Sequence, residues 1–299
     1  MHVSLKSKTS NLDYYDVISF CWCREGAQVL VIVAMISSSS SSPPPSSSRP
    51  RDGPATLFEV DPVMAEILRS EESSMDDFGL VLVVGWPPNQ DEMEAPYAAF
   101  VKSMRSCFDH DDEENAYIYP LDSLHITVAT FHHFSLETRD PEQRSILERE
   151  WRQVALAASK RPEWPKYPLK LEIDSCQIGT HAGILLWRET TGGLDSMRFC
   201  LARETSDRQS LFLKAGLNVD TLKIPDIVHS SILRYPSPIK TNGELVQERL
   251  RKNVLPRLKE IFPKPMTAST AVLVYERTPY LHLPYDDSHA LETFELTET

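Results

Sequence analysis

The residues of this chain best suited to chemistry are two histidines, each followed two positions later by a hydroxyl side chain. They occur as His125-Ile126-Thr127 and His229-Ser230-Ser231. Residues i and i+2 of a β-strand point to the same face, so each segment can place an imidazole beside a hydroxyl. Two imidazoles can act as general base and general acid near neutral pH, while the hydroxyls hold charged oxygens. The pattern predicts phosphodiester cleavage that requires neither a metal ion nor another cofactor.

The spacing His-x-Ser/Thr is not specific by itself, because four of the nine histidines match it. His2 lies near the N-terminus, and His133 stands where the alternation of a strand breaks down. The other two matches lie in apolar segments that each precede a helical segment, LHITVATF at 124–131 and IVHSSILRY at 227–235. Strict alternation in the first segment would place Thr130 on the face opposite to its histidine.

Two other groups of polar residues raise the question of a metal ion. The acidic run at 109–114 has the charge of a cation site, but runs of like charge normally face water, so we expect a solvated loop. A cluster of His125, His132 and His133 is disfavoured, because alternation along a strand points these side chains in different directions. We therefore predict no metal site and expect the remaining histidines to be surface or core residues.

The segments around the two motifs alternate between strands and helices. Apolar, β-branched or alternating runs predict strands at 79–86, 124–131, 169–178, 182–187, 227–235 and 268–275. Amphipathic spacing predicts helices at 91–108, 140–160, 194–206 and 243–261, the last kinked or split by Pro256. This order, without a glycine-rich nucleotide fingerprint, indicates an α/β or α+β protein.

The paired segments LHITVATF and VHSSILRY, about 100 residues apart, resemble the two H-x-T/S motifs of the two-histidine (2H) phosphoesterase superfamily. This superfamily includes 2′,3′-cyclic phosphodiesterases, RNA ligase-like bacterial proteins and the phosphoesterase-like domain of an A-kinase anchor protein. The resemblance covers roughly residues 77–280. It implies an α+β, bilobal fold in which two pseudo-symmetric sheet-plus-helix lobes surround a central cleft. The second motif departs from the family pattern at Ser230, where a hydrophobic residue is usual and the side chain should face away from the cleft.

The resemblance also implies roles for individual residues. His125 and His229 would form the acid/base pair, with either one as the acid, and Thr127 and Ser231 would bind phosphate. Aromatic residues in such clefts often stack on a base, and the candidates near strand ends are Trp86, Tyr235 and Tyr275. Packing in the core explains each of these three at least as well, because aromatic side chains dominate cores.

Three functions are compatible with these residues. The leading one is metal-independent hydrolysis of a small cyclic or RNA-derived phosphodiester of the 2′,3′-cyclic nucleotide type. The second is a module that binds a nucleotide such as AMP with little or no turnover, and the third is an RNA-end-processing exonuclease or ligase-like protein. The third would need a basic rim near the second motif, built from Lys214, Lys223, Arg234 and Lys240.

The composition limits the partners. The 299 residues carry 31 Lys+Arg against 43 Asp+Glu, and the net charge of −12 argues against long nucleic-acid tracts. It does not exclude a small nucleotide or RNA-end phosphodiester in a local pocket. Five cysteines are an odd and sparse set in a chain of this length, so we expect no disulfide framework and a reducing compartment, cytoplasmic or nuclear. We expect a monomer that does not bind membranes.

The N-terminal segment differs from the rest of the chain. Its apolar run at 27–36 is far shorter than the ~20 residues of a membrane span, while organelle or secretory targeting stays open. The Ser/Pro stretch at 37–48 cannot form a core. We therefore expect residues 1–55 to be a disordered tail with a Ser/Pro-rich linker, and residues 56–299 to form the 2H phosphoesterase-like domain.

Overall fold

The structure is a computed structural model, and it describes residues 58–69, 78–133, 140–216, 219–276 and 287–296. The chain divides into two units, residues 1–51 and 52–299, and all described residues belong to the second unit. The predicted tail and its boundary at residue 55 lie outside the described residues, so that prediction stays a prediction.

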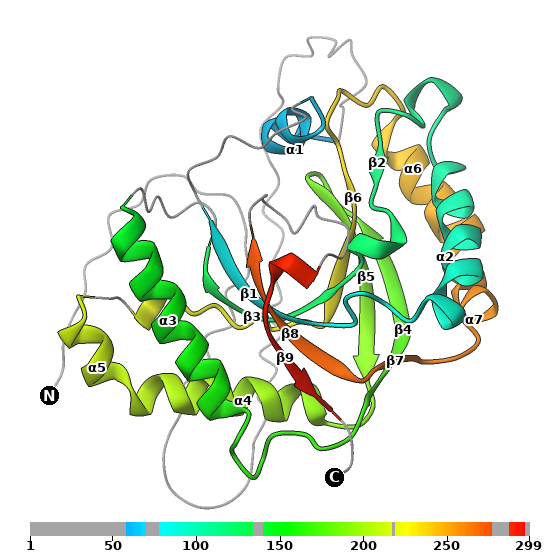
Figure 1. Cartoon of the computed structure of the whole chain (residues 1–299). Helices are drawn as coiled ribbons and strands as arrows, with labels where there is room; N and C mark the ends of the chain where they lie inside the picture. Colours follow the sequence, from blue (N-terminus) through cyan, green and yellow to red (C-terminus); the bar gives the residue numbers. More distant parts are fainter. Residues whose placement is uncertain (1–57, 70–77, 134–139, 217–218, 277–286, 297–299) are drawn as a thin grey trace, which may run out of the picture. The chain divides into compact units, whose positions relative to one another are not determined.

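Two antiparallel sheets form the centre of the second unit (Figure 1). The four-stranded sheet contains, in spatial order, β3 (Ile126–His132), β1 (Gly79–Val84), β8 (Thr270–Glu276) and β9 (Ala290–Glu295). The five-stranded sheet contains β2 (Tyr117–Ile118), β6 (His229–Arg234), β5 (Ala182–Glu189), β4 (Leu169–Ile178) and β7 (Met266–Ala268). The first motif therefore lies at an edge of one sheet, and the second motif lies inside the other sheet.

Different helices cover the two sheets (Figure 1). Three helices lie beside the four-stranded sheet: α3 (Pro141–Ala158), α4 (Gly193–Asp207) and α5 (Gln209–Lys214). The five-stranded sheet is accompanied by α2 (Gln90–Arg105), α6 (Gly243–Arg249) and α7 (Leu258–Ile261), and the short helix α1 (Pro62–Ile67) precedes β1. No described helix has the length and apolar character that a membrane crossing requires. The arrangement confirms the predicted α+β, bilobal fold class.

Local sequence signals explain the best-predicted elements. All six residues of β1 are buried, because β3 and β8 flank this strand and apolar clusters cover both of its faces. Helix α3 begins at Pro141, which lacks an N–H that the first turn would leave unpaired. The side chain of Asp140 caps this helix by accepting a hydrogen bond from the N–H of Glu142 at 3.0 Å.

Several elements differ from the sequence-based expectation. As Pro256 suggests, the helix predicted at 243–261 is divided, with a π-helical turn at Leu250–Val254 and a 3₁₀ turn at Leu255–Arg257 between α6 and α7. The strand predicted at 268–275 corresponds to β8, but Ala268 is the last residue of β7, because the chain passes from one sheet to the other at Ser269. Two short α-helices, α1 and α5, and two short strands, β2 and β9, have no counterpart in the expectation.

The acidic run at 109–114 is only partly solvated, which corrects the expectation of a solvated loop. Asp112 is 1% exposed, and its Oδ2 accepts hydrogen bonds from the N–H of Lys240 at 2.8 Å and the hydroxyl of Thr241 at 2.7 Å. Burial raises the pKa of Asp112, but these hydrogen bonds outweigh it and lower the pKa below its ordinary value. Asp112 therefore anchors the loop that follows β6. Within the described ranges, no group of three or more His, Cys, Asp or Glu is arranged to hold a metal ion.

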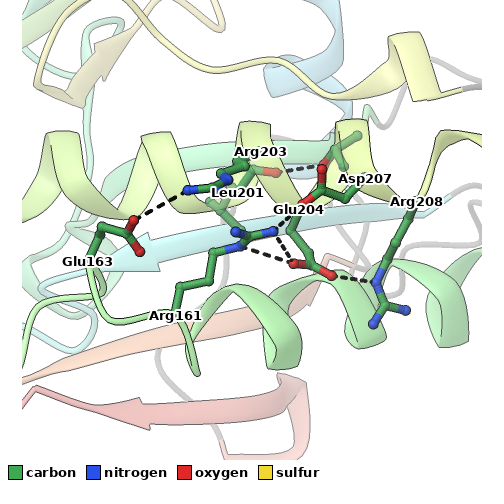
Figure 2. A network of polar contacts seen from close by, with 8 residues as sticks. Arg161, Glu163, Leu201, Arg203, Glu204, Asp207 and Arg208 are labelled. Carbon is green, nitrogen blue, oxygen red and sulfur yellow. Dashed lines mark hydrogen bonds and ion pairs between the residues drawn. The ribbon is translucent and has the colours of Figure 1, made fainter.

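A network of charged residues joins α4 to the turn after α3 (Figure 2). Arg161 donates a hydrogen bond to Glu204 at 2.7 Å and also pairs with Asp207. Glu204 accepts a second hydrogen bond from Arg208 at 2.7 Å. This network fixes α4, which also contacts β3, against the end of α3.

Candidate active site

The two motifs belong to different sheets, but the structure brings them together. The hydroxyl of Ser230 on β6 donates a hydrogen bond to the backbone carbonyl of His125, with 2.6 Å between the two oxygens. His125 directly precedes β3, and His229 is the first residue of β6. His229 is also close enough to His125 to contribute electrostatically to its pKa. The two histidines therefore lie near each other, and their roles as acid and base stay a prediction.

Each motif strand has a β-bulge directly after its hydroxyl residue. On β3 the pairing with β1 shifts between Thr127 and Ala129, and on β6 the pairing with β5 shifts between Ser231 and Leu233. One extra residue reverses the alternation of a strand. Three half-buried residues of each motif therefore share one face: His125, Thr127 and Thr130 on the first, and His229, Ser231 and Arg234 on the second. The expectation that Thr130 faces away from His125 is wrong for this reason.

Gly183 on β5 accommodates the bulge of β6. It lies opposite Leu233, directly beside the shift in pairing. A Cβ atom at position 183 would lie 2.8 Å from the Cβ of Leu233, closer than packed carbon atoms approach. A residue without a side chain is required here, and the bulge places Arg234 on the face of the motif.

Both imidazoles are hydrogen-bonded to the carbonyl two residues upstream. Nδ1 of His125 lies 2.9 Å from the carbonyl oxygen of Ser123, and the ring of His229 is hydrogen-bonded to the backbone of Ile227. A carbonyl oxygen only accepts, so Nδ1 of His125 carries a proton, and Nε2 has a free lone pair when the ring is neutral.

The surroundings of the two rings favour their neutral forms. Burial, with a contribution from His229, lowers the pKa of His125 to about 4. Burial also lowers the pKa of His229, and the positive charges of Arg198 and Arg234 add to this effect. Both imidazoles are therefore mainly neutral at pH 7 when no ligand is bound.

The two predicted phosphate-binding hydroxyls stand beside the imidazoles. Thr127 pairs with Val83 of β1, and Ser231 pairs with Ile184 of β5, so each hydroxyl has an apolar neighbour on its face. Neither hydroxyl is hydrogen-bonded to another described residue. Both can therefore donate to the oxygens of a bound phosphate.

Of the three aromatic residues predicted to stack on a base, two are buried and the third is half-buried on the face opposite to the first motif. Trp86 packs beside Val83 and is 1% exposed. Tyr235 is 0% exposed, and its hydroxyl donates to the carbonyl of Gly179 at 3.0 Å. Tyr275 pairs with Leu80, which places it on the face of the four-stranded sheet opposite to Thr127. Its ring stacks on that of Phe78, with centroids 5.2 Å apart, so core packing accounts for all three residues.

Two of the four residues of the predicted basic rim lie at the motif face. Arg234 shares this face and forms an ion pair with Asp61 at 3.4 Å. Lys223 and Thr130 exchange two backbone hydrogen bonds of 2.8 Å, so the side chain of Lys223 lies on the face of Thr130 and is exposed. The other two residues lie elsewhere. Lys214 is at the end of α5, and Lys240 is in the loop that Asp112 anchors.

The sequence-based reasoning missed Arg198, a buried guanidinium between the two motifs. Arg198 is 8% exposed, and its Nη2 donates to the carbonyl of Ile227 at 3.1 Å and lies 3.5 Å from that of Thr127. Its ion pair with the exposed Asp195 is long, at 3.9 Å. One sequence signal could have identified Arg198. It is a charged residue on the apolar stripe of a predicted helix, and the stripe also contains Leu194, Met197 and Leu201.

Comparisons with known proteins give similarity only to solved structures. No family model and no curated protein matches the chain. A conserved protein of unknown function from Agrobacterium tumefaciens is 15% identical with a TM-score of 0.37, over 68% of this chain and 82% of that one. Escherichia coli LigT complexed with 3′-AMP is 13% identical with a TM-score of 0.39, over 74% and 99%. The protein TT0787 of Thermus thermophilus is 15% identical with a TM-score of 0.41, over 73% and 97%. Similarity at this level carries no argument about family or activity.

Proposed function

We propose that this protein is a metal-independent phosphoesterase that hydrolyses a small cyclic or RNA-derived phosphodiester of the 2′,3′-cyclic nucleotide type. The observation that supports this proposal is the hydrogen bond between Ser230 and the carbonyl of His125, which joins the two motifs. Because the motifs come from separate sheets, a ligand between them can be approached by an imidazole and a hydroxyl from each side. A general base and a general acid are both needed at a phosphorus atom that gains one oxygen and loses another.

The proposed roles follow from the surroundings of each side chain. His125 is the general base, because its low pKa keeps the ring neutral and Nε2 can accept a proton from water. As the water oxygen bonds to phosphorus, the bond to the leaving oxygen breaks, and this oxygen takes a proton from His229. Thr127 and Ser231 donate hydrogen bonds to the non-bridging oxygens. The negative charge of the bound substrate raises the pKa of His229, so this ring is protonated in the complex and can act as the acid.

Turnover of a 2′,3′-cyclic mononucleotide in the presence of EDTA tests this proposal. We expect the full-length chain to release a nucleoside 2′- or 3′-phosphate, detected by chromatography, at the same rate with and without the chelator. A rate that EDTA abolishes and a divalent cation restores would contradict the metal-independent mechanism. The absence of turnover with all four bases would contradict the proposed substrate type.

The neutral state of both rings favours a second candidate, a module that binds a nucleotide such as AMP with little turnover. With His229 deprotonated, the site holds the hydrogen-bond donors of a phosphate site but lacks the general acid. Calorimetry with AMP, combined with a product assay for 2′,3′-cyclic AMP, separates the two candidates. Tight binding of AMP without product formation would select the binding module.

The position of Lys223 predicts a preference for ligands with more than one phosphate. We expect Lys223→Gln to weaken binding of a dinucleotide that ends in a 2′,3′-cyclic phosphate by about 3–10-fold, and to reduce the salt slope by about 0.7. Binding of the cyclic mononucleotide should change less. Lys214→Gln, the same change on α5, should alter neither affinity. Fluorescence anisotropy at several salt concentrations measures both quantities, and equal effects of the two variants would contradict the prediction.

A further inference from the structure

The relative position of the two motifs is not fixed by a β-ladder. β3 pairs with β1, and β6 pairs with β2 and β5, but the two motif strands do not pair with each other. Within a sheet, backbone hydrogen bonds set the register of neighbouring strands. Between β3 and β6 this alignment must come from other contacts, and two polar side chains provide them.

The first of these side chains is Ser230, the residue that departs from the pattern of the 2H motifs. It is 1% exposed and faces away from the site. Its hydroxyl donates to the carbonyl of His125 at 2.6 Å and accepts from the indole N–H of Trp187 at 3.0 Å. The directions are fixed, because a carbonyl only accepts and an indole only donates. A hydrophobic residue at this position would leave both buried partners without this hydrogen bond.

The second side chain is Arg198 on α4. Its Nη2 donates to the carbonyl of Ile227, which also accepts the hydrogen bond from the ring of His229. The same nitrogen lies 3.5 Å from the carbonyl of Thr127 on the other motif. The guanidinium therefore contacts the backbone of both motifs and holds the carbonyl that orients one imidazole.

Burial of Arg198 is unfavourable unless its contacts compensate for lost hydration. Its Nε has no hydrogen-bond partner among the described residues, and the contact with the exposed Asp195 is a long one of 3.9 Å. Burial also lowers the pKa of Arg198, which reflects the cost of a charge in this position. A core position would be served better by an apolar side chain. The contacts with the motif carbonyls are the compensating feature that this structure shows.

We propose that Ser230 and Arg198 form a clamp that sets the separation and orientation of His125 and His229. Both are then positioning residues of the site, acting through the backbone rather than on the substrate. The inference rests on the proposed function for its kinetic consequence, but the geometry of the clamp does not depend on that function. A displacement of one imidazole by a fraction of an ångström is sufficient to lower catalysis strongly.

Kinetic measurements on four variants and two matched controls test the clamp. We expect Ser230→Ala and Arg198→Met each to lower kcat by about 10–100-fold with little change in KM. The conservative variants Ser230→Thr and Arg198→Lys should restore most of kcat. Thr205→Ala removes a buried hydroxyl that bonds only within α4, and Arg152→Met removes a guanidinium that joins α3 to Glu292 of β9. Both controls should lose thermal stability but keep the wild-type kcat.

Titration of the histidine rings by NMR tests the clamp independently of activity. We expect Arg198→Met to raise the pKa of His229, because a positive charge near this ring is removed. We expect Ser230→Ala to raise the pKa of His125, because the ring becomes less buried and moves away from His229. If the wild type hydrolyses no phosphodiester, the proposed function fails while these shifts still support the clamp. Unchanged titrations of both rings in the two clamp variants, with kcat equal to that of the controls, would overturn the proposal.

Discussion

His125→Asn and His229→Asn should each lower kcat for a 2′,3′-cyclic nucleotide by about 10³-fold, because general acid–base catalysis contributes factors of this size. An asparagine at position 125 can still donate a hydrogen bond to the carbonyl of Ser123, so the backbone around the motif is retained. It cannot exchange a proton with water or with a leaving oxygen near neutral pH. KM should change by less than about threefold, because Thr127 and Ser231 still bind the phosphate.

The double variant and one matched control sharpen this prediction. The two imidazoles act as a unit, so His125→Asn combined with His229→Asn should cost about as much as either change alone. His132→Asn makes the same chemical change on β3. A second shift in the pairing with β1, between Thr130 and His132, puts this ring on the opposite face, where it is buried and stacks on Phe78 with centroids 4.8 Å apart. This variant should lower the thermal midpoint and keep kcat. A His125→Asn variant with a tenth of the wild-type kcat would contradict the role of the general base.

The sequence alone predicts several of the elements around the motifs, because each has a local cause. β1 is a continuous apolar run, and α3 has a proline in its first turn and an apolar stripe. The α+β fold class follows from the order of such segments. The two bulges have no comparable local signal. They depend on which strand lies opposite, as the close approach of Gly183 to Leu233 shows.

The aromatic candidates show a second limit of sequence reasoning. Alternation along a strand separates two faces, but it does not say which face belongs to the site. Tyr275 lies on the face opposite to Thr127 because it pairs with Leu80, a contact between segments far apart in the chain. Tyr235 is taken into the core because its hydroxyl reaches the carbonyl of Gly179. Residue type and spacing therefore predict the imidazoles and hydroxyls, but not which large side chains line the site.

The clamp is the part of the site with the weakest sequence signal. Arg198 is recognisable as a charge on an apolar helix stripe, but its acceptors are carbonyls 29 and 71 residues away in the chain. Ser230 stands out only as a departure from the motif pattern. Both residues bind backbone carbonyls, which every residue has. A pattern of side chains along the sequence therefore does not show which carbonyls they bind.

The second large effect concerns pH: kcat/KM should be highest in mildly acidic solution. This ratio reports the ionisation of the free enzyme. His125 must be neutral to act as a base, so activity should fall below about pH 4, where its ring becomes protonated. His229 must be protonated to act as an acid, and its pKa lies below the ordinary 6.5, so activity should fall by about tenfold per unit at higher pH.

The pH profile of kcat should differ from that of kcat/KM in a definite direction. A bound phosphodiester anion raises the pKa of His229, so the alkaline limb of kcat should move to higher pH than that of kcat/KM. Arg198→Met removes a positive charge near His229 and should move the alkaline limb of kcat/KM in the same direction. Initial rates between pH 4 and 9 at constant ionic strength measure the alkaline limbs of kcat and of kcat/KM. A kcat/KM that rises steadily to pH 9 would contradict the assignment of His229 as the acid, because no proton would then be lost from a required group.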